Sequence, residues 1–243
     1  MLGAAGLASL LLGAAGAPLL PSVLSTGDLV FVMPLLDDAQ PVDAAILDTG
    51  LATVEWLRSV AHVNVSSNAA TATHVALALR NRSGLFFVEA TPPVVTITPA
   101  AAFWARESRS TTWRRGVIDL ANRSVAAAAV AVAAAQVGKP YATLFEPPSS
   151  GSFYCSSLVV YAFRAALARH RVFVDERFVL IFKPRSFWAS YYSPTPLPVN
   201  ASGSNPTLLL HSARVAASGV GPHQSRSRRQ TGRVASRVVR TTA

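Results

Sequence analysis

The feature that most constrains this sequence is a pair of β-prone runs joined by a tight turn. The runs are 72–80 and 85–90, and the turn between them reads Asn-Arg-Ser-Gly. This composition is typical of a β-hairpin, because Asn and Gly accept the backbone angles that tight turns require. Pairing Arg80 with Leu85 across the turn sets the register of the whole hairpin.

This register places a histidine and a carboxylate on one face of the hairpin. Glu89 lies opposite Ala76 and becomes the diagonal neighbour of His74. Diagonal neighbours are about 7 to 8 Å apart at the backbone, which two long polar side chains can span. The sequence therefore predicts a histidine oriented by a carboxylate, a pair that suits general acid–base chemistry.

A single cysteine, Cys155, stands among 243 residues, where a small-residue loop meets an apolar helical stretch. The free N–H groups and the positive dipole end at a helix start favour a thiolate and can receive an oxyanion. This position indicates a nucleophile. The alternative is an inert buried thiol, because free cysteine is among the most buried residue types. One cysteine excludes an intrachain disulfide.

Five short segments occur in the order that is typical of the circularly permuted papain-like amidases. They are Gly27–Phe31, Thr73–Val75, Val88–Ala90, Gly138–Tyr141 and Phe153–Val159. Through them, residues 26–190 resemble the YiiX and YaeF-like relatives of the NlpC cell-wall peptidases, in which the histidine and its polar partner precede the cysteine. The resemblance implies an α+β, permuted papain-like fold, with an antiparallel sheet packed against the helix that bears the cysteine.

The resemblance also implies a role for each of three residues. Cys155 would be the nucleophile, His74 the general base and acid, and Glu89 the residue that orients the imidazole. A thiol needs such a base to become the attacking thiolate, and the leaving amine needs the proton returned. The implied activity is a cysteine hydrolase that cleaves an amide in a peptide or lipid-linked substrate. A thiol acyltransferase or thioesterase acting on acyl lipids at a membrane is the first alternative, and a non-catalytic binding module is the second.

Residues next to the cysteine are candidates for the substrate pocket or the oxyanion site. Tyr154 and Ser156 are the two, although Tyr154 is equally well explained as a core aromatic. Ser157 stands where the family usually has a glutamate, and Ala76 where it usually has a glycine, which leaves the substrate pocket and the rate open. Asp28 is expected to be a turn residue.

Other candidate chemistry is weak in this chain. His62, His170, His211 and His223 are scattered, and no metal-binding motif or Gly-rich phosphate loop occurs, so neither a metal nor a cofactor is expected. A helix over 122–138 and a strand over 177–182 are expected as scaffold. A helix-like run over 51–60 is a candidate cover for the site.

The first 24 residues are apolar and uncharged. They predict a secretory signal peptide, with an uncleaved membrane anchor as the alternative. Four Asn-x-Ser glycosylation acceptors agree with a secretory route to a secreted, lumenal or lysosomal location. They are Asn64, Asn81, Asn122 and Asn200.

Residues 191–243 are expected to form a disordered Ser/Pro/Arg-rich basic tail. Seven arginines and no acidic residue follow position 204, so the net charge of +10 comes largely from this tail. The tail and the apolar N-terminus would suit an anionic membrane surface. Nucleic acid is not an expected partner, because no aromatic interleaving or reader motif occurs. The oligomeric state does not follow from the sequence.

Overall fold

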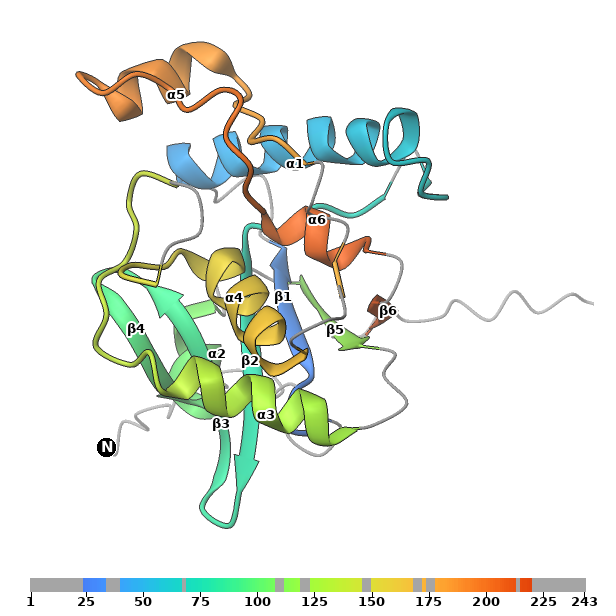
Figure 1. The fold of residues 1–243 in the computed structure, drawn as a ribbon, viewed down its shortest axis with the longest axis vertical. Coiled ribbons are helices and arrows are strands. Elements are labelled where there is room, and N and C mark those ends of the chain that lie inside the picture. Colours follow the sequence, from blue (N-terminus) through green and yellow to red (C-terminus); the bar gives the residue numbers. More distant parts are fainter. Residues whose placement is uncertain are drawn as a thin grey trace, which may run out of the picture.

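The computed structural model describes residues 24–33, 40–66, 69–107, 112–118, 123–145, 150–167, 172–173, 178–212 and 215–219. Within these ranges one antiparallel sheet has the strand order β4-β3-β2-β1-β5-β6 (Figure 1). The strands are β1 (Leu29–Met33), β2 (His74–Asn81), β3 (Gly84–Thr91), β4 (Val94–Pro99), β5 (Thr112–Ile118) and β6 (Val215–Gly219).

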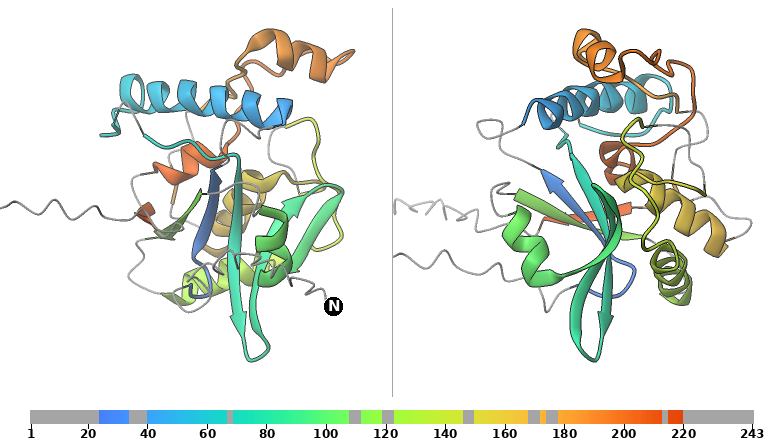
Figure 2. Two further views of the ribbon diagram at one scale, coloured as in Figure 1. Left: turned by 180° about the vertical axis from the view of Figure 1, so that it is seen from behind. Right: turned by 90° about the vertical axis from the view of Figure 1, so that its left-hand side faces the viewer.

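Helices cover both faces of this sheet and one of its ends. They are α1 (Pro41–Ser59), α2 (Ala100–Glu107), α3 (Arg123–Ala134), α4 (Cys155–Leu167), α5 (Arg185–Tyr192) and α6 (Pro206–Leu210). The pair α3 and α4 lies on one face and α2 on the other, while α1 and α5 lie beyond one end of the sheet (Figure 2). The predicted α+β arrangement, with an antiparallel sheet against the cysteine-bearing helix, is confirmed.

The central strand β1 is buried on both faces. Leu29 and Phe31 join a large core that α3 and α4 complete, whereas Val30 and Val32 join a second core that includes Phe103 of α2. This division follows from the two-residue period of a strand, which sends successive side chains to opposite faces. An unbroken apolar run is therefore what this position in the sheet requires.

The hairpin predicted from the sequence is formed by β2 and β3, with the predicted register. Arg80 pairs with Leu85, and Leu77 pairs with Val88. Gly84 closes the turn with a φ of +134°, a backbone conformation that residues other than glycine rarely adopt. The hairpin register is therefore confirmed.

The helix α4, which begins with Cys155, reaches the hairpin from the opposite face to the histidine. Cys155 belongs to the large core with Val75, whereas Ala76, on the same strand face as His74, belongs to the second core. His74 is the first residue of β2, and Cys155 is the first residue of α4. The two side chains therefore meet at the end of the strand, close enough for Cys155 to act on the pKa of His74.

The chain beyond residue 190 is built into the domain, which corrects the predicted tail boundary. All five residues of α6 are buried, and Leu209 and Leu210 join the large core. Asn205 caps this helix by accepting the Leu208 N–H at 2.7 Å, and β6 then pairs with β5. The apolar run Leu208–Leu210 is too short to show a helical period. Its apolar character is also lost when composition is averaged over the arginine-rich sequence that follows. Residues 220–243 lie outside the described residues.

The strand expected over 177–182 does not form in its described part, residues 178–182. Val179 makes one isolated bridge with Ser202, while Phe178 packs in a cluster with Leu57 of α1. A continuous apolar run fits a buried loop as well as a buried strand, since periodicity cannot separate the two. The expected helices are present as α3 and, beginning ten residues before the predicted run, as α1.

Several location predictions concern residues at the surface or outside the described ranges. Asn64, Asn81 and Asn200 are exposed, so their glycosylation stays a prediction, while Asn122 and residues 1–23 lie outside the described residues. Among the helices that are described, none combines the length and hydropathy needed to cross a bilayer.

Candidate active site

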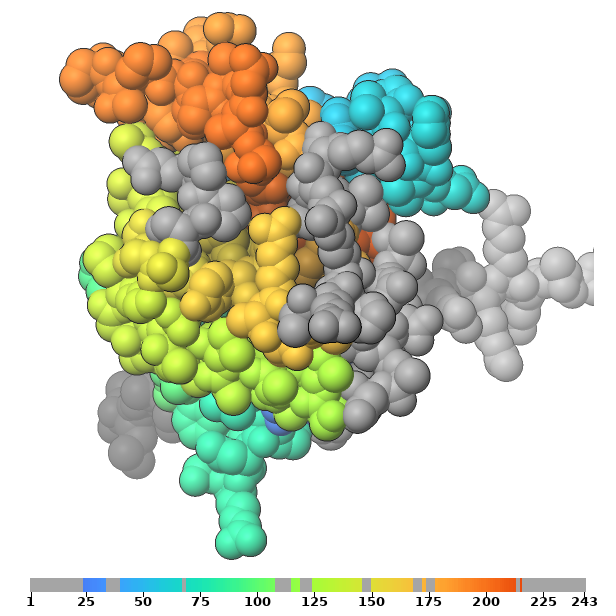
Figure 3. All heavy atoms as spheres, in the orientation of Figure 1, coloured from blue at the N-terminus to red at the C-terminus, as the bar shows by residue number. Residues whose placement is uncertain are grey.

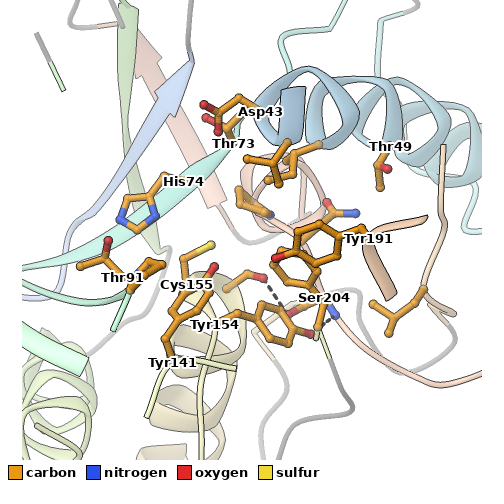
Figure 4. A pocket seen from close by; sticks show the side chains of 18 of the residues that line it. Asp43, Thr49, Thr73, His74, Thr91, Tyr141, Tyr154, Cys155, Tyr191 and Ser204 are labelled. Atoms are coloured by element: carbon orange, nitrogen blue, oxygen red, sulfur yellow. Dashed lines mark hydrogen bonds between the residues drawn. The ribbon is translucent and has the colours of Figure 1, made fainter. Parts of the chain in front are cut away.

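A pocket of about 400 Å³ opens at the end of the sheet where α4 begins. Side chains of α1 and α5 line it together with the first residues of β2 and α4 (Figure 4). The charged or titratable lining includes Asp43, His74, Arg106, Glu107 and Cys155. Its aromatic lining comprises Tyr141, Phe145, Tyr154, Phe182, Trp188 and Tyr191.

Cys155 borders this pocket at the first position of α4, with 5% of its surface exposed. The turn before it is held by Ser157, whose hydroxyl accepts the Tyr154 N–H and donates to the Tyr154 carbonyl, both at 2.9 Å. Ser157 is itself buried, where a carboxylate would need a charged partner. Ser157 therefore fixes the start of α4.

His74 and Glu89 form the predicted pair across β2 and β3. The imidazole Nε2 lies 2.7 Å from a Glu89 carboxylate oxygen, Oε2. The other carboxylate oxygen accepts the Thr98 hydroxyl at 2.6 Å, and the Glu89 side chain is fully buried. Because Nε2 faces the carboxylate, Nδ1 is the ring nitrogen left for Cys155. The predicted reach between the two side chains is confirmed.

Charges in this group of side chains support one another. Burial opposes a charge on His74, but its hydrogen bonds to Cys155 and Glu89 outweigh burial and raise its pKa from 6.5 to about 10. Burial also opposes a charge on Glu89, but the hydrogen bond from His74, supported by Arg106 and Thr98, lowers its pKa from 4.5 to about 2. At neutral pH the pair is therefore an imidazolium held by a carboxylate.

The two predicted pocket residues beside Cys155 are hydrogen-bonded to one later segment. The Tyr154 hydroxyl accepts the Ser204 N–H at 3.2 Å, and the Ser156 hydroxyl accepts the Ser204 hydroxyl at 3.1 Å (Figure 4). Tyr154 is buried, and its ring lies edge-on to Phe145 at 5.4 Å. Both residues thus line the pocket, with their hydroxyls held by Ser204.

Residues 204–207, here named the strap, tie together the elements that carry the site. Besides the bonds of Ser204 to α4, the Asn205 amide donates to the Thr53 hydroxyl of α1 at 2.8 Å. The Thr207 hydroxyl accepts the Ala72 N–H at 3.0 Å, two residues before the histidine. In the space-filling view α5 and the chain after it form the upper surface of the molecule (Figure 3).

Two residues at the site had no role predicted from the sequence. Tyr141 stands beside Cys155, and its ring is directed toward the cysteine sulfur (Figure 4). Burial, followed by the charge of Cys155, raises the pKa of Tyr141, so its hydroxyl remains a hydrogen-bond donor. Arg106, from α2, donates to Glu89 Oε2 at 2.7 Å. The Gly-Lys-Pro-Tyr motif pointed to the first, but no motif marks the second.

Comparisons with known proteins identify the family and the fold. The model of the permuted papain-like amidases of the YaeF/YiiX, C92 family matches residues 55–213. A crystal structure described as the metalloprotein YiiX from Escherichia coli O157:H7 superposes with a TM-score of 0.60 at 18% identity, over 80% of this chain and 96% of that one. The predicted permuted papain-like fold is thereby confirmed. Comparison with curated proteins finds no match.

The description as a metalloprotein applies to that neighbour, and the described side chains of this chain do not fit a metal site. Among the described residues, no group of three or more His, Cys, Asp or Glu side chains is arranged to hold a metal ion. Cys155 and His74 face each other, and Glu89 accepts hydrogen bonds on both oxygens.

Proposed function

Because the chain belongs to the permuted papain-like amidases of the YaeF/YiiX, C92 family, we propose that Cys155, His74 and Glu89 form its catalytic triad. The reaction is the hydrolysis of an amide bond in a peptide or lipid-linked substrate. The observation that carries the proposal is the chain of contacts from Cys155 through His74 to Glu89 at the wall of one pocket. Such a chain activates a thiol and fixes the orientation of its base.

Acylation begins with attack of the Cys155 sulfur on the amide carbonyl carbon. The carbonyl π electrons move to oxygen, and the Tyr141 hydroxyl, beside the sulfur, donates a hydrogen bond to this oxyanion together with N–H groups at the start of α4. His74, protonated at neutral pH, gives its Nδ1 proton to the leaving nitrogen as the carbon–nitrogen bond breaks. A thioester and a free amine result.

Deacylation uses the same residues in reverse. The neutral imidazole of His74 takes a proton from water, whose oxygen attacks the thioester carbon. The carbon–sulfur bond then breaks, releasing the carboxylic acid and the Cys155 thiolate. Glu89 stays ionised throughout, because its pKa is held at about 2 by its hydrogen bonds, and it stabilises the imidazolium that forms.

The aromatic lining supports a second candidate, acyl transfer or thioester hydrolysis on an apolar acyl group. Phe145 lies 5.5 Å from Trp188 and 6.3 Å from Tyr191, measured between ring centroids, so these rings form one apolar wall. An acyl chain would bury apolar surface there at about 25 cal/mol per Å². Acyl transfer to a lipid amine would identify this candidate, and transfer to water would identify the hydrolase.

The triad is tested with the full chain and a library of peptide amides, acyl amides and thioesters. Cys155→Ala and His74→Ala are each expected to bring turnover close to background, and the double variant is expected to be little worse because the two residues act as one unit. Tyr161→Phe, on the same helix but outside the pocket lining, is the matched control. Near-normal turnover of His74→Ala, or strictly multiplying defects, would refute the triad. Absence of Cys155-dependent turnover with every substrate would favour the second alternative, a non-catalytic binding module.

A further inference from the structure

The Glu89 carboxylate receives more positive charge than a single histidine supplies. Its side chain is fully buried, and its Oε2 accepts both His74 Nε2 and an Arg106 N–H at 2.7 Å each. Thr98 donates to the remaining oxygen. An ionised carboxylate out of water is costly unless paired and hydrogen-bonded, so each of these donors supports the charged form.

Arg106 is held in place from three sides. Its second contact is an ion pair at 2.7 Å between its Nε and Glu107, the last residue of the same helix. Its guanidinium carbon also lies 5.2 Å from the centre of the Phe103 ring, within the range of a cation–π contact. A guanidinium restrained in this way presents a fixed donor to Glu89 without a further loss of side-chain freedom.

We propose that Arg106 is a positioning residue, whose guanidinium keeps the Glu89 carboxylate ionised and directed at His74 when the surroundings become acidic. The inference rests on the proposed triad for its meaning in catalysis. It assigns the arginine to the orienting carboxylate, although the side chain also lines the pocket and is 39% exposed. A guanidinium that already donates to two carboxylates has few N–H groups left for a third, which argues against substrate recognition.

The charges that surround this carboxylate come from four elements. His74 lies on β2, and Arg106 and Glu107 on α2, all within the network. Asp43 of α1 is close enough to Glu107 and to His74 for their charges to act on its own pKa, which burial raises first. Cys155 of α4 lies beyond the imidazole. Arg106 keeps its positive charge at every pH, whereas the charge of His74 depends on pH. Replacing Arg106 therefore removes an attraction to Glu89 that no change of pH restores.

The consequence for pH is a shift in one direction. The hydrogen bonds of His74 and then Arg106 lower the pKa of Glu89, so removing Arg106 raises that pKa. An opposite charge in contact lowers a carboxyl pKa by about 1 to 3 units. The acid limb of kcat against pH is therefore expected to move upward by about one pH unit or more in Arg106→Met. Arg106→Lys, which keeps the charge and loses the fork geometry, is expected to shift it less.

The experiment compares the full-length wild type with Arg106→Met, Arg106→Lys and Arg58→Met. Arg58 pairs with Glu55 on the exposed side of α1, so its variant removes a similar ion pair far from the pocket and is the matched control. Two readouts are measured. One is the pH profile of kcat and KM, and the other is the titration of the Glu89 carboxyl carbon by NMR, which needs no turnover.

We expect Arg106→Met to raise the Glu89 midpoint and lower kcat while KM changes less than about twofold, with Arg106→Lys in between. An unchanged Glu89 midpoint would overturn the proposal. A raised KM with an unchanged acid limb would also overturn it, because it would make Arg106 a substrate-binding residue. If Arg106→Met does not fold, Arg106→Lys decides by the same two readouts. If the wild type shows no thiol-dependent turnover, the triad fails, while the titration still judges Arg106.

Discussion

The charge on Glu89 sets how far into alkaline conditions His74 keeps its proton. Glu89→Gln preserves the size of the side chain and one oxygen acceptor for the 2.7 Å contact with Nε2, but it removes the negative charge. Interactions with Cys155 and with Glu89 raise the pKa of His74 to about 10, and in Glu89→Gln only the interaction with Cys155 keeps its full strength. An opposite charge in contact is worth about 1 to 3 pKa units, so the His74 pKa is expected to fall by that amount.

The expected result is a change in the shape of the pH profile as well as in its height. The form proposed to be active requires the imidazolium, so the alkaline limb of kcat is expected to move to lower pH by about 1 to 3 units. Because the charge that stabilises the imidazolium is lost, kcat is expected to fall by about 10- to 1,000-fold. A raised histidine pKa stabilises the fold fully below 6.5 and loses that contribution as pH rises through about 10. In Glu89→Gln this loss should come at lower pH.

The assay is steady-state turnover of the best library substrate from pH 5 to 11, together with thermal unfolding at each pH. Glu55→Gln, whose carboxylate pairs with Arg58 at an exposed position, is the matched control and is expected to leave both profiles unchanged. An alkaline limb at the same pH in Glu89→Gln and the wild type would refute the reasoning, even if kcat fell. A fall in kcat alone would show that Glu89 acts only through packing.

Three further results are expected. Tyr141→Phe should lower kcat by about 10- to 100-fold with the unfolding temperature nearly unchanged, because a donor to the oxyanion is lost; equal losses in Tyr161→Phe would contradict this. A chain ending at residue 203 should lose cooperative thermal unfolding, since it lacks the buried α6 and strand β6; a sharp transition in circular dichroism would show that the strap is dispensable. Gly50→Ala places a methyl group 2.7 Å from Thr207 Oγ1 and should destabilise the fold by about 1 to 3 kcal/mol, more than Leu51→Ala at an exposed position of the same helix.

Local rules were enough to predict the parts of the site that lie within one hairpin or at one helix start. Strand alternation and a tight turn place His74 beside Glu89, and the boundary between loop and apolar stretch places Cys155 at the start of α4. The resemblance to a family supplied the step that joins these two pieces. Each of these inferences depends on residues that are close in sequence or on a motif.

The remaining parts of the site depend on contacts between distant segments, which carry no local signal. Arg106 meets Glu89 because α2, a short helix after β4, folds back over the sheet. No pattern in the eight residues of α2 indicates that contact. Ser204 meets Tyr154 across about fifty positions, and its surroundings in sequence are polar and small. Composition alone assigned this region to a tail, because a few buried leucines weigh little in an average.

The strap determines at what point during synthesis the candidate site can be completed. His74 leaves the ribosome first and Cys155 follows, but the hydrogen bonds of the Ala72 N–H and the Tyr154 hydroxyl to the strap can form only after residues 204–207 have been synthesised. A nascent chain of intermediate length therefore holds His74 and Cys155 without the hydrogen bonds by which the strap ties their two elements together. The site can therefore be completed only after residues 204–207 have been made, and a stalled or truncated product that stops before Ser204 is expected to carry the thiol without the organised pocket.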